Sequence, residues 1–213
     1  SEISSDEPSQ TVDAEAAMTV RGLGDPDAPV VMQEFASLSC PHCAQFHKAN
    51  YEKLKTEFID TGKVYFVFHD FPLNGPALDA SMIARCMPHD RYFQFIKFLF
   101  DTQEKWAFSQ DPRKALRQNA KLLGAGDDLL DSCLEDQKLK QDLIARMQEN
   151  SEKYEIKSTP SFVLNDGQVL KGALSYDTFK TEIEKLLPAE TPAETEATAQ
   201  ENNNNEQGTE EAE

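Results

Sequence analysis

Two cysteines separated by a proline and a histidine stand between a predicted strand and a predicted helix, and no other feature constrains the fold as much. Residues 30–35 form a short apolar, β-branched run that is typical of a strand buried on both faces. Residues 44–58 place apolar side chains three and four positions apart, as an amphipathic helix does. Cys40 and Cys43 therefore lie where the chain passes from strand to helix, with Cys40 at the helix N-terminus.

The remaining apolar patterns predict an α/β core that is interrupted by helices. A second buried strand is predicted at 64–68, and a hairpin with a tight turn at 162–170. Helical spacing is found at 77–87, 91–105, 112–123, 137–154 and 176–187. Asp111 before Pro112 predicts a capped helix start, and Gly124 predicts its end. Because the helical block falls between strands, we expect an inserted helical domain.

The two ends of the chain differ from the middle in charge and composition. Residues 1–19 hold five acids and residues 188–213 hold eight, with no base in either stretch, so the net charge of −17 falls to −4 for the middle. Segments so poor in apolar residues are expected to be disordered, here 1–17 and 188–213. The middle has no basic cluster, which argues against a nucleic-acid partner, and no run approaches the roughly 18 apolar residues of a membrane span.

The position of Cys40 favours its ionised form. Unpaired backbone N–H groups and the helix macrodipole stabilise a negative charge at a helix N-terminus, and a protonated His42 would add positive potential. Pro41 costs no hydrogen bond in a first turn, and Cys43 lies one turn further on, where a disulfide can close. Since only the dithiol carries this charge, the disulfide should be an oxidant.

A structural zinc site is the main alternative for the same residues. Zinc would need two further ligands, which Cys86 and Cys133 or the histidines at 42, 47, 69 and 89 could supply. The chain has no second closely spaced cysteine pair of the zinc-ribbon kind, so we favour redox chemistry. No glycine-rich phosphate loop, nucleophilic serine motif or catalytic carboxylate pair is evident, so we expect no cofactor and no metal.

Three segments together resemble the DsbA family of bacterial periplasmic thiol oxidases. They are Glu34-Phe-Ala-Ser-Leu-Ser-Cys40-Pro-His-Cys43, His69-Asp-Phe-Pro-Leu73 and Ser158-Thr-Pro160-Ser-Phe. The resemblance covers about residues 18–187. It implies a thioredoxin-like fold with an inserted all-helical domain, divided into a first part at 18–75, the insertion at 76–150 and a second part at 151–187.

The same resemblance assigns roles to individual residues. It implies that Cys40 is the exposed nucleophile and Cys43 the buried resolving cysteine. Thr159-Pro160 resembles the loop whose cis proline faces the active-site disulfide, and the Thr159 hydroxyl either stabilises a thiolate weakly or has no effect. Glu34 matches an acid beneath the redox centre that helps to move the proton of Cys43. The family's usual basic residue before Asp-Phe-Pro is His69 here, which puts an ion pair at that spot in doubt.

The resemblance also implies a setting and partners. Because relatives carry a second disulfide in the helical domain, we expect Cys86 and Cys133 to be bonded rather than free, and hence an oxidising compartment. The implied activity is donation of the Cys40–Cys43 disulfide to reduced, unfolded exported polypeptides, with reoxidation by a DsbB-like membrane partner. We expect a periplasmic monomer whose export signal has been removed; a disulfide isomerase or reductase of the same fold is the alternative.

Overall fold

A five-stranded mixed sheet forms the centre of the molecule in this computed structural model, which describes residues 12–165 and 167–189. The strands are β1 (Gly22–Leu23), β2 (Val30–Ala36), β3 (Val64–Asp70), β4 (Ser161–Leu164) and β5 (Gln168–Lys171), in the order β1-β3-β2-β4-β5. The long strands β2 and β3 are parallel, and the other pairs are antiparallel. The central strand β2 is buried on both faces, as its largely apolar, β-branched sequence predicts, and this burial includes the polar residues Gln33 and Glu34.

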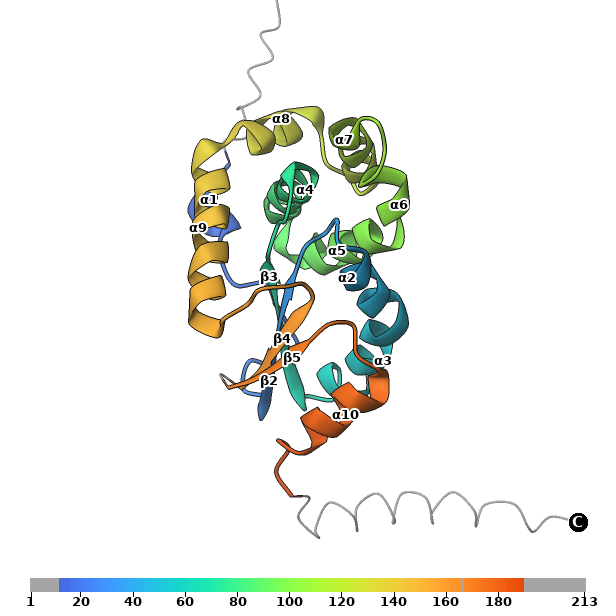
Figure 1. Cartoon of the computed structure of the whole chain (residues 1–213). Helices are drawn as coiled ribbons and strands as arrows, with labels where there is room; N and C mark the ends of the chain where they lie inside the picture. The colour runs from blue at the N-terminus through green and yellow to red at the C-terminus, as the bar shows by residue number, and fades with distance from the viewer. Residues whose placement is uncertain (1–11, 166, 190–213) are drawn as a thin grey trace, which may run out of the picture.

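Helices cover both faces of this sheet (Figure 1). On one side lie α2 (Pro41–Phe46), α3 (Glu52–Leu54) and α10 (Tyr176–Glu184), and on the other lies the long helix α9 (Gln137–Tyr154). Two π-helical turns, at His47–Tyr51 and Lys55–Ile59, interrupt the predicted helix 44–58. Single π turns of this kind rotate the side chains that follow them and occur often at functional sites.

The inserted helices lie at one end of the sheet, between β3 and β4 in the chain (Figure 1). At that end lie α4 (Gly75–Cys86), a 3₁₀ turn (His89–Arg91), α5 (Tyr92–Asp101), α6 (Gln103–Trp106), α7 (Pro112–Leu122) and α8 (Asp127–Glu135), and α9 continues from them along one face of the sheet. The predicted α/β core with a helical insertion is confirmed. The Asp111 cap is confirmed too, because its carboxylate accepts from the Lys114 N–H. None of the helices in the described part of the chain is long and apolar enough to cross a membrane.

Two helix predictions in the insertion need correction. The pattern at 91–105 predicts one helix, but the helix is interrupted at Thr102. The break turns Gln103 and Trp106 into the interior, where the Trp106 indole donates to the Leu99 carbonyl at 2.8 Å. Helix α8, at Asp127–Glu135, was not expected, although its buried residues Leu130, Cys133 and Leu134 have helical spacing; the segment is short and rich in acids.

Regular structure begins nearer the N-terminus than the composition predicts. Residues 1–17 were expected to be disordered, yet Ala14–Ala17 form helix α1, capped by the Asp13 carboxylate. Ala14 and Ala17 are buried in one apolar cluster with Leu139 and Leu143 of α9. Small side chains on a capped turn can pack closely on a neighbouring helix, and this contact depends on the tertiary fold. The expected disorder of 1–11 and 190–213 falls outside the described residues.

Candidate redox site

The Cys40-Pro41-His42-Cys43 segment sits at the junction that the sequence predicts. β2 ends at Ala36, a turn closes with the Cys40 N–H donating to the Ser37 carbonyl at 3.0 Å, and α2 begins at Pro41. Cys40 is the residue that precedes the helix, with extended backbone angles. Both cysteines are free thiols, Cys40 partly exposed and Cys43 fully buried. The structure thus describes the reduced pair.

The surroundings of Cys40 favour its thiolate. The pKa of Cys40 falls from 9.0 to about 5, first because the Cys43 thiol donates a hydrogen bond to it. Burial opposes this shift, while the Thr159 side chain and the backbone N–H groups of Cys43 and His42 add to it. These N–H groups belong to the first turn of α2, which has no carbonyl partners within its own helix. The direction agrees with the sequence-based expectation.

His42 acts on Cys40 in a different way from the one predicted. A protonated His42 imidazole was expected to stabilise the thiolate, but this side chain is exposed to solvent. The contribution of His42 to the low pKa of Cys40 comes from its backbone N–H. Solvent screens the charge of an exposed ring, whereas a backbone donor in the first helical turn is fixed in place.

Cys43 has the opposite character. Burial raises its pKa well above the ordinary range, and the hydrogen bond to Cys40 and the negative charge of Glu34 raise it further. At neutral pH, Cys43 therefore keeps its proton while Cys40 loses its own. In such a pair, the sulfur that is a stable anion is suited to attack, and the sulfur that keeps its proton is suited to resolve the disulfide.

The Thr159-Pro160 loop faces the exposed cysteine. The peptide bond between these residues is cis, as the resemblance implies, and the Thr159 carbonyl oxygen lies 3.5 Å from the Cys40 Sγ. The Thr159 hydroxyl is buried and has no hydrogen-bond partner among the described residues. Its interaction with the sulfur lowers the pKa of Cys40. Whether the Thr159 hydroxyl stabilises the thiolate or has no effect stays a prediction, because the hydroxyl makes no hydrogen bond to the sulfur in this structure.

Glu34 lies beneath the pair and has a partner that the sequence analysis missed. Its carboxylate is fully buried on the central strand, and both oxygens lie close to the Nε2 of His47, at 2.8 and 3.1 Å. His47 is also buried and stacks on Phe100, with ring centroids 4.2 Å apart. A signal was present in the sequence: His47 follows Cys43 by four residues, so the two share one helix face.

Comparison with known proteins places this arrangement in a family. The family model described as Thioredoxin matches residues 16–185. The chain belongs to the thioredoxin family. It is 30% identical over 184 residues to disulfide bond formation protein D of Bacillus subtilis, covering 78% of this chain and 76% of that protein. The crystal structure of Wolbachia pipientis alpha-DsbA1 matches with a TM-score of 0.74 and 31% identity, covering 79% of this chain and 91% of that one.

A Rickettsia felis protein, named provisionally as a protein-disulfide oxidoreductase, is 32% identical over 166 residues. The match covers 78% of this chain but 59% of the Rickettsia protein, so the chain spans about three fifths of the length of that relative. The sequence and structural matches together confirm the resemblance to DsbA proteins and the thioredoxin-like fold with its helical insertion.

In this thioredoxin-family chain, His69 makes different contacts from those that its position in the sequence suggests. His69 does not reach Glu34; it stacks on Phe35, with ring centroids 4.6 Å apart, and shares a 2.9 Å hydrogen bond with the Gln33 side chain. Burial is the main cause that lowers the pKa of His69 to about 4, so it is neutral at neutral pH. Successive side chains of a strand point to opposite faces, and Gln33 and Phe35 flank Glu34. His69 is therefore part of the packing on the opposite face of the sheet.

The predicted second disulfide is confirmed. Cys86, at the end of α4, is bonded to Cys133 of α8 with an S–S distance of 2.02 Å, which joins two helices of the insertion. This bond removes one of the two sources of further ligands that a zinc site at Cys40 and Cys43 could have used, the other being the histidines.

Proposed function

We propose that this chain is a protein thiol-disulfide oxidase that donates a Cys40–Cys43 disulfide to reduced polypeptides. The observation that carries the proposal is the contrast between the two sulfurs: a half-buried Cys40 with a pKa of about 5, and a buried Cys43 whose pKa is raised. Anything that stabilises the Cys40 thiolate stabilises the reduced enzyme, and so makes the disulfide a stronger oxidant. The printed names of its relatives support thiol-disulfide chemistry in general.

The exchange begins when a substrate thiolate attacks the Cys40 sulfur of the oxidised enzyme. The Cys40–Cys43 bond breaks, its electron pair goes to Cys43, and a mixed disulfide forms between the substrate and Cys40. A second thiolate of the substrate then attacks the substrate sulfur of that mixed disulfide and releases Cys40 as a thiolate. The substrate loses two electrons and gains a disulfide, and the enzyme gains the two electrons. A low pKa makes Cys40 a good leaving group in this last step.

Cys43 must gain a proton in the first step, because its buried sulfur does not remain an anion. Glu34 is the buried acid whose charge acts on Cys43, and His47 holds that carboxylate in place. We assign to Glu34 the movement of this proton. The carbonyl and amide groups around Thr159-Pro160 are assigned to an extended substrate segment, since this loop lies beside the Cys40 sulfur.

The proposed setting is outside the cytoplasm, in the periplasm. The Cys86–Cys133 disulfide supports it, because such bonds persist in oxidising compartments. The proposed substrates are reduced, unfolded exported polypeptides, and the proposed electron acceptor for the spent enzyme is a DsbB-like membrane protein. We further propose that the chain acts as a monomer without a nucleic-acid partner.

The test is oxidative refolding of a reduced protein that requires disulfides, with oxidised wild-type chain compared with Cys40→Ser. The wild type should form substrate disulfides in stoichiometric amounts, and the variant should form none. A scrambled substrate with incorrect disulfides is the second arm: faster repair of that substrate than oxidation of the reduced one would instead support an isomerase. Bound metal at one equivalent after gentle purification, lost in Cys40→Ser, would support the metal-binding alternative.

A further inference from the structure

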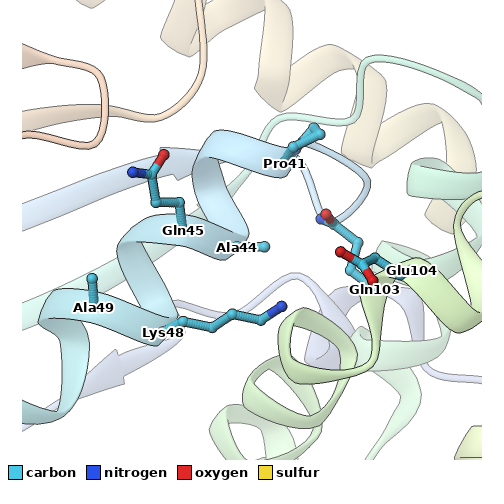
Figure 2. Close-up of a pocket in the computed structure, with 7 residues that line it drawn as sticks. All are labelled: Pro41, Ala44, Gln45, Lys48, Ala49, Gln103 and Glu104. Carbon is cyan, nitrogen blue, oxygen red and sulfur yellow. The ribbon is translucent and has the colours of Figure 1, made fainter.

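The inserted domain reaches the redox site through one buried amide, that of Gln103. This residue lies in α6 and is only 3% exposed. Its Nε2 donates to the carbonyl of Leu38 at 2.8 Å and to the carbonyl of Cys40 at 3.0 Å. Figure 2 shows Gln103 extending from the insertion toward the loop that leads into Pro41. Both amide hydrogens are thus used on the backbone that carries the exposed cysteine.

These two carbonyls belong to the turn that sets the position of Cys40. The Cys40 N–H closes the turn on Ser37, and the Cys40 carbonyl also accepts the Ala44 N–H at 3.1 Å, the first hydrogen bond of α2. Buried carbonyls without a donor are costly, so a side chain that supplies two donors fixes this backbone conformation. An apolar side chain of similar length would fill the same space and supply neither donor.

The orientation of this turn matters because hydrogen bonds weaken steeply when donor and acceptor are misaligned. The Cys40 thiolate receives the backbone N–H groups of His42 and Cys43, which follow Cys40 directly in the chain. A turn that rotates by a few tens of degrees would aim these N–H groups away from the sulfur. The Gln103 amide restrains that rotation from a different domain of the fold.

We propose that Gln103 is a positioning residue, which holds the main chain of Cys40 so that the first-turn N–H groups of α2 stay directed at its sulfur. This inference rests on the proposed function and deepens it. If Gln103 has this role, the strength of the Cys40–Cys43 disulfide as an oxidant depends on how the helical insertion packs against the redox site. A purely structural Gln103 would instead affect folding and leave the chemistry of the sulfur unchanged.

The test compares Gln103→Met with a matched control, Gln45→Met. Gln45 is exposed on α2 and lines the same pocket as the buried Gln103, so the control makes the same chemical change nearby without removing a hydrogen bond to the Cys40 turn. In each reduced protein, the ultraviolet absorbance of the thiolate is followed against pH, and the equilibrium with glutathione is measured. The unfolding midpoint of each oxidised protein is measured in parallel.

We expect Gln103→Met to raise the apparent pKa of Cys40 by about one, and to weaken oxidation of glutathione about tenfold at neutral pH. Gln45→Met should leave both values unchanged. If Gln103→Met fails to fold, Gln103→Asn keeps a polar amide but withdraws it by one methylene, and it should raise the pKa in the same direction. An unchanged pKa and equilibrium in the folded variant, with only a lower unfolding midpoint, would overturn the positioning role. A wild-type Cys40 that titrates near 9 would instead refute the proposed oxidase function itself.

Discussion

The low pKa of Cys40 makes the stability of the reduced protein depend on pH in a way that can be calculated. Its pKa is about 5 in the folded dithiol and 9.0 as its ordinary value. Between these values the unfolded chain binds more protons than the folded chain, so the reduced protein gains stability as pH rises. The contribution is lost as pH falls through 5 and is complete only above pH 9.

At pH 7 the contribution of Cys40 to the free energy of unfolding is smaller than the full pKa shift would give. The folded thiol is almost fully ionised there and the unfolded thiol is almost fully protonated, which gives about 3 kcal/mol in favour of the folded dithiol. For a two-electron couple this corresponds to about 60 mV toward a more oxidising disulfide. The whole shift, about 5 kcal/mol, would be reached only above pH 9.

Denaturant unfolding of the reduced protein across pH 4 to 9, compared with reduced Cys40→Ser, measures this contribution. The variant keeps the other titrating groups but has no thiol at position 40, so the difference between the two curves isolates Cys40. We expect the wild type to gain about 3 kcal/mol relative to the variant between pH 4 and pH 7. A difference that does not change with pH in this range would refute the electrostatic account of Cys40, and with it the claim that the thiolate makes the disulfide oxidising.

Three further predictions concern the surroundings of the site. Thr159→Val should raise the pKa of Cys40, and Thr159→Ser should keep that pKa at its wild-type value, as measured by thiolate absorbance. The same Cys40 pKa in Thr159→Val and the wild type would show that the hydroxyl is inert. His47→Leu should cost about 3–5 kcal/mol in urea unfolding because it leaves the Glu34 carboxylate buried alone, whereas adding Glu34→Gln should recover much of that loss. Replacing Cys86 and Cys133 together by Ala should lower the free energy of unfolding by up to about 4 kcal/mol while leaving the thiolate titration unchanged, and a shifted titration would mean that the second disulfide reaches the active site.

Much of the site could be predicted from the sequence because its parts are local. A thiol at residue 40, directly before a helix, meets first-turn N–H groups wherever that helix is placed, so the direction of its pKa shift follows from the order strand, cysteine, helix. The helix 137–154 was predicted with its observed bounds, since eighteen residues of apolar side chains three and four positions apart are a signal within one segment. The family resemblance added the cis bond at Pro160, which local pattern does not reveal.

What the sequence could not supply are contacts between segments far apart in the chain. The pairing of Glu34 with His47 joins the central strand to the helix after the redox motif, and no pattern within either segment predicts that the two side chains meet. Gln103 reaches Leu38 and Cys40 only because the helix breaks at Thr102. Local periodicity determines which segments are helices and strands, but packing of distant side chains determines which buried polar groups meet. The sequence alone therefore determined the reactive sulfur and its charge, and only the tertiary structure decided which residues hold that sulfur and its proton in place.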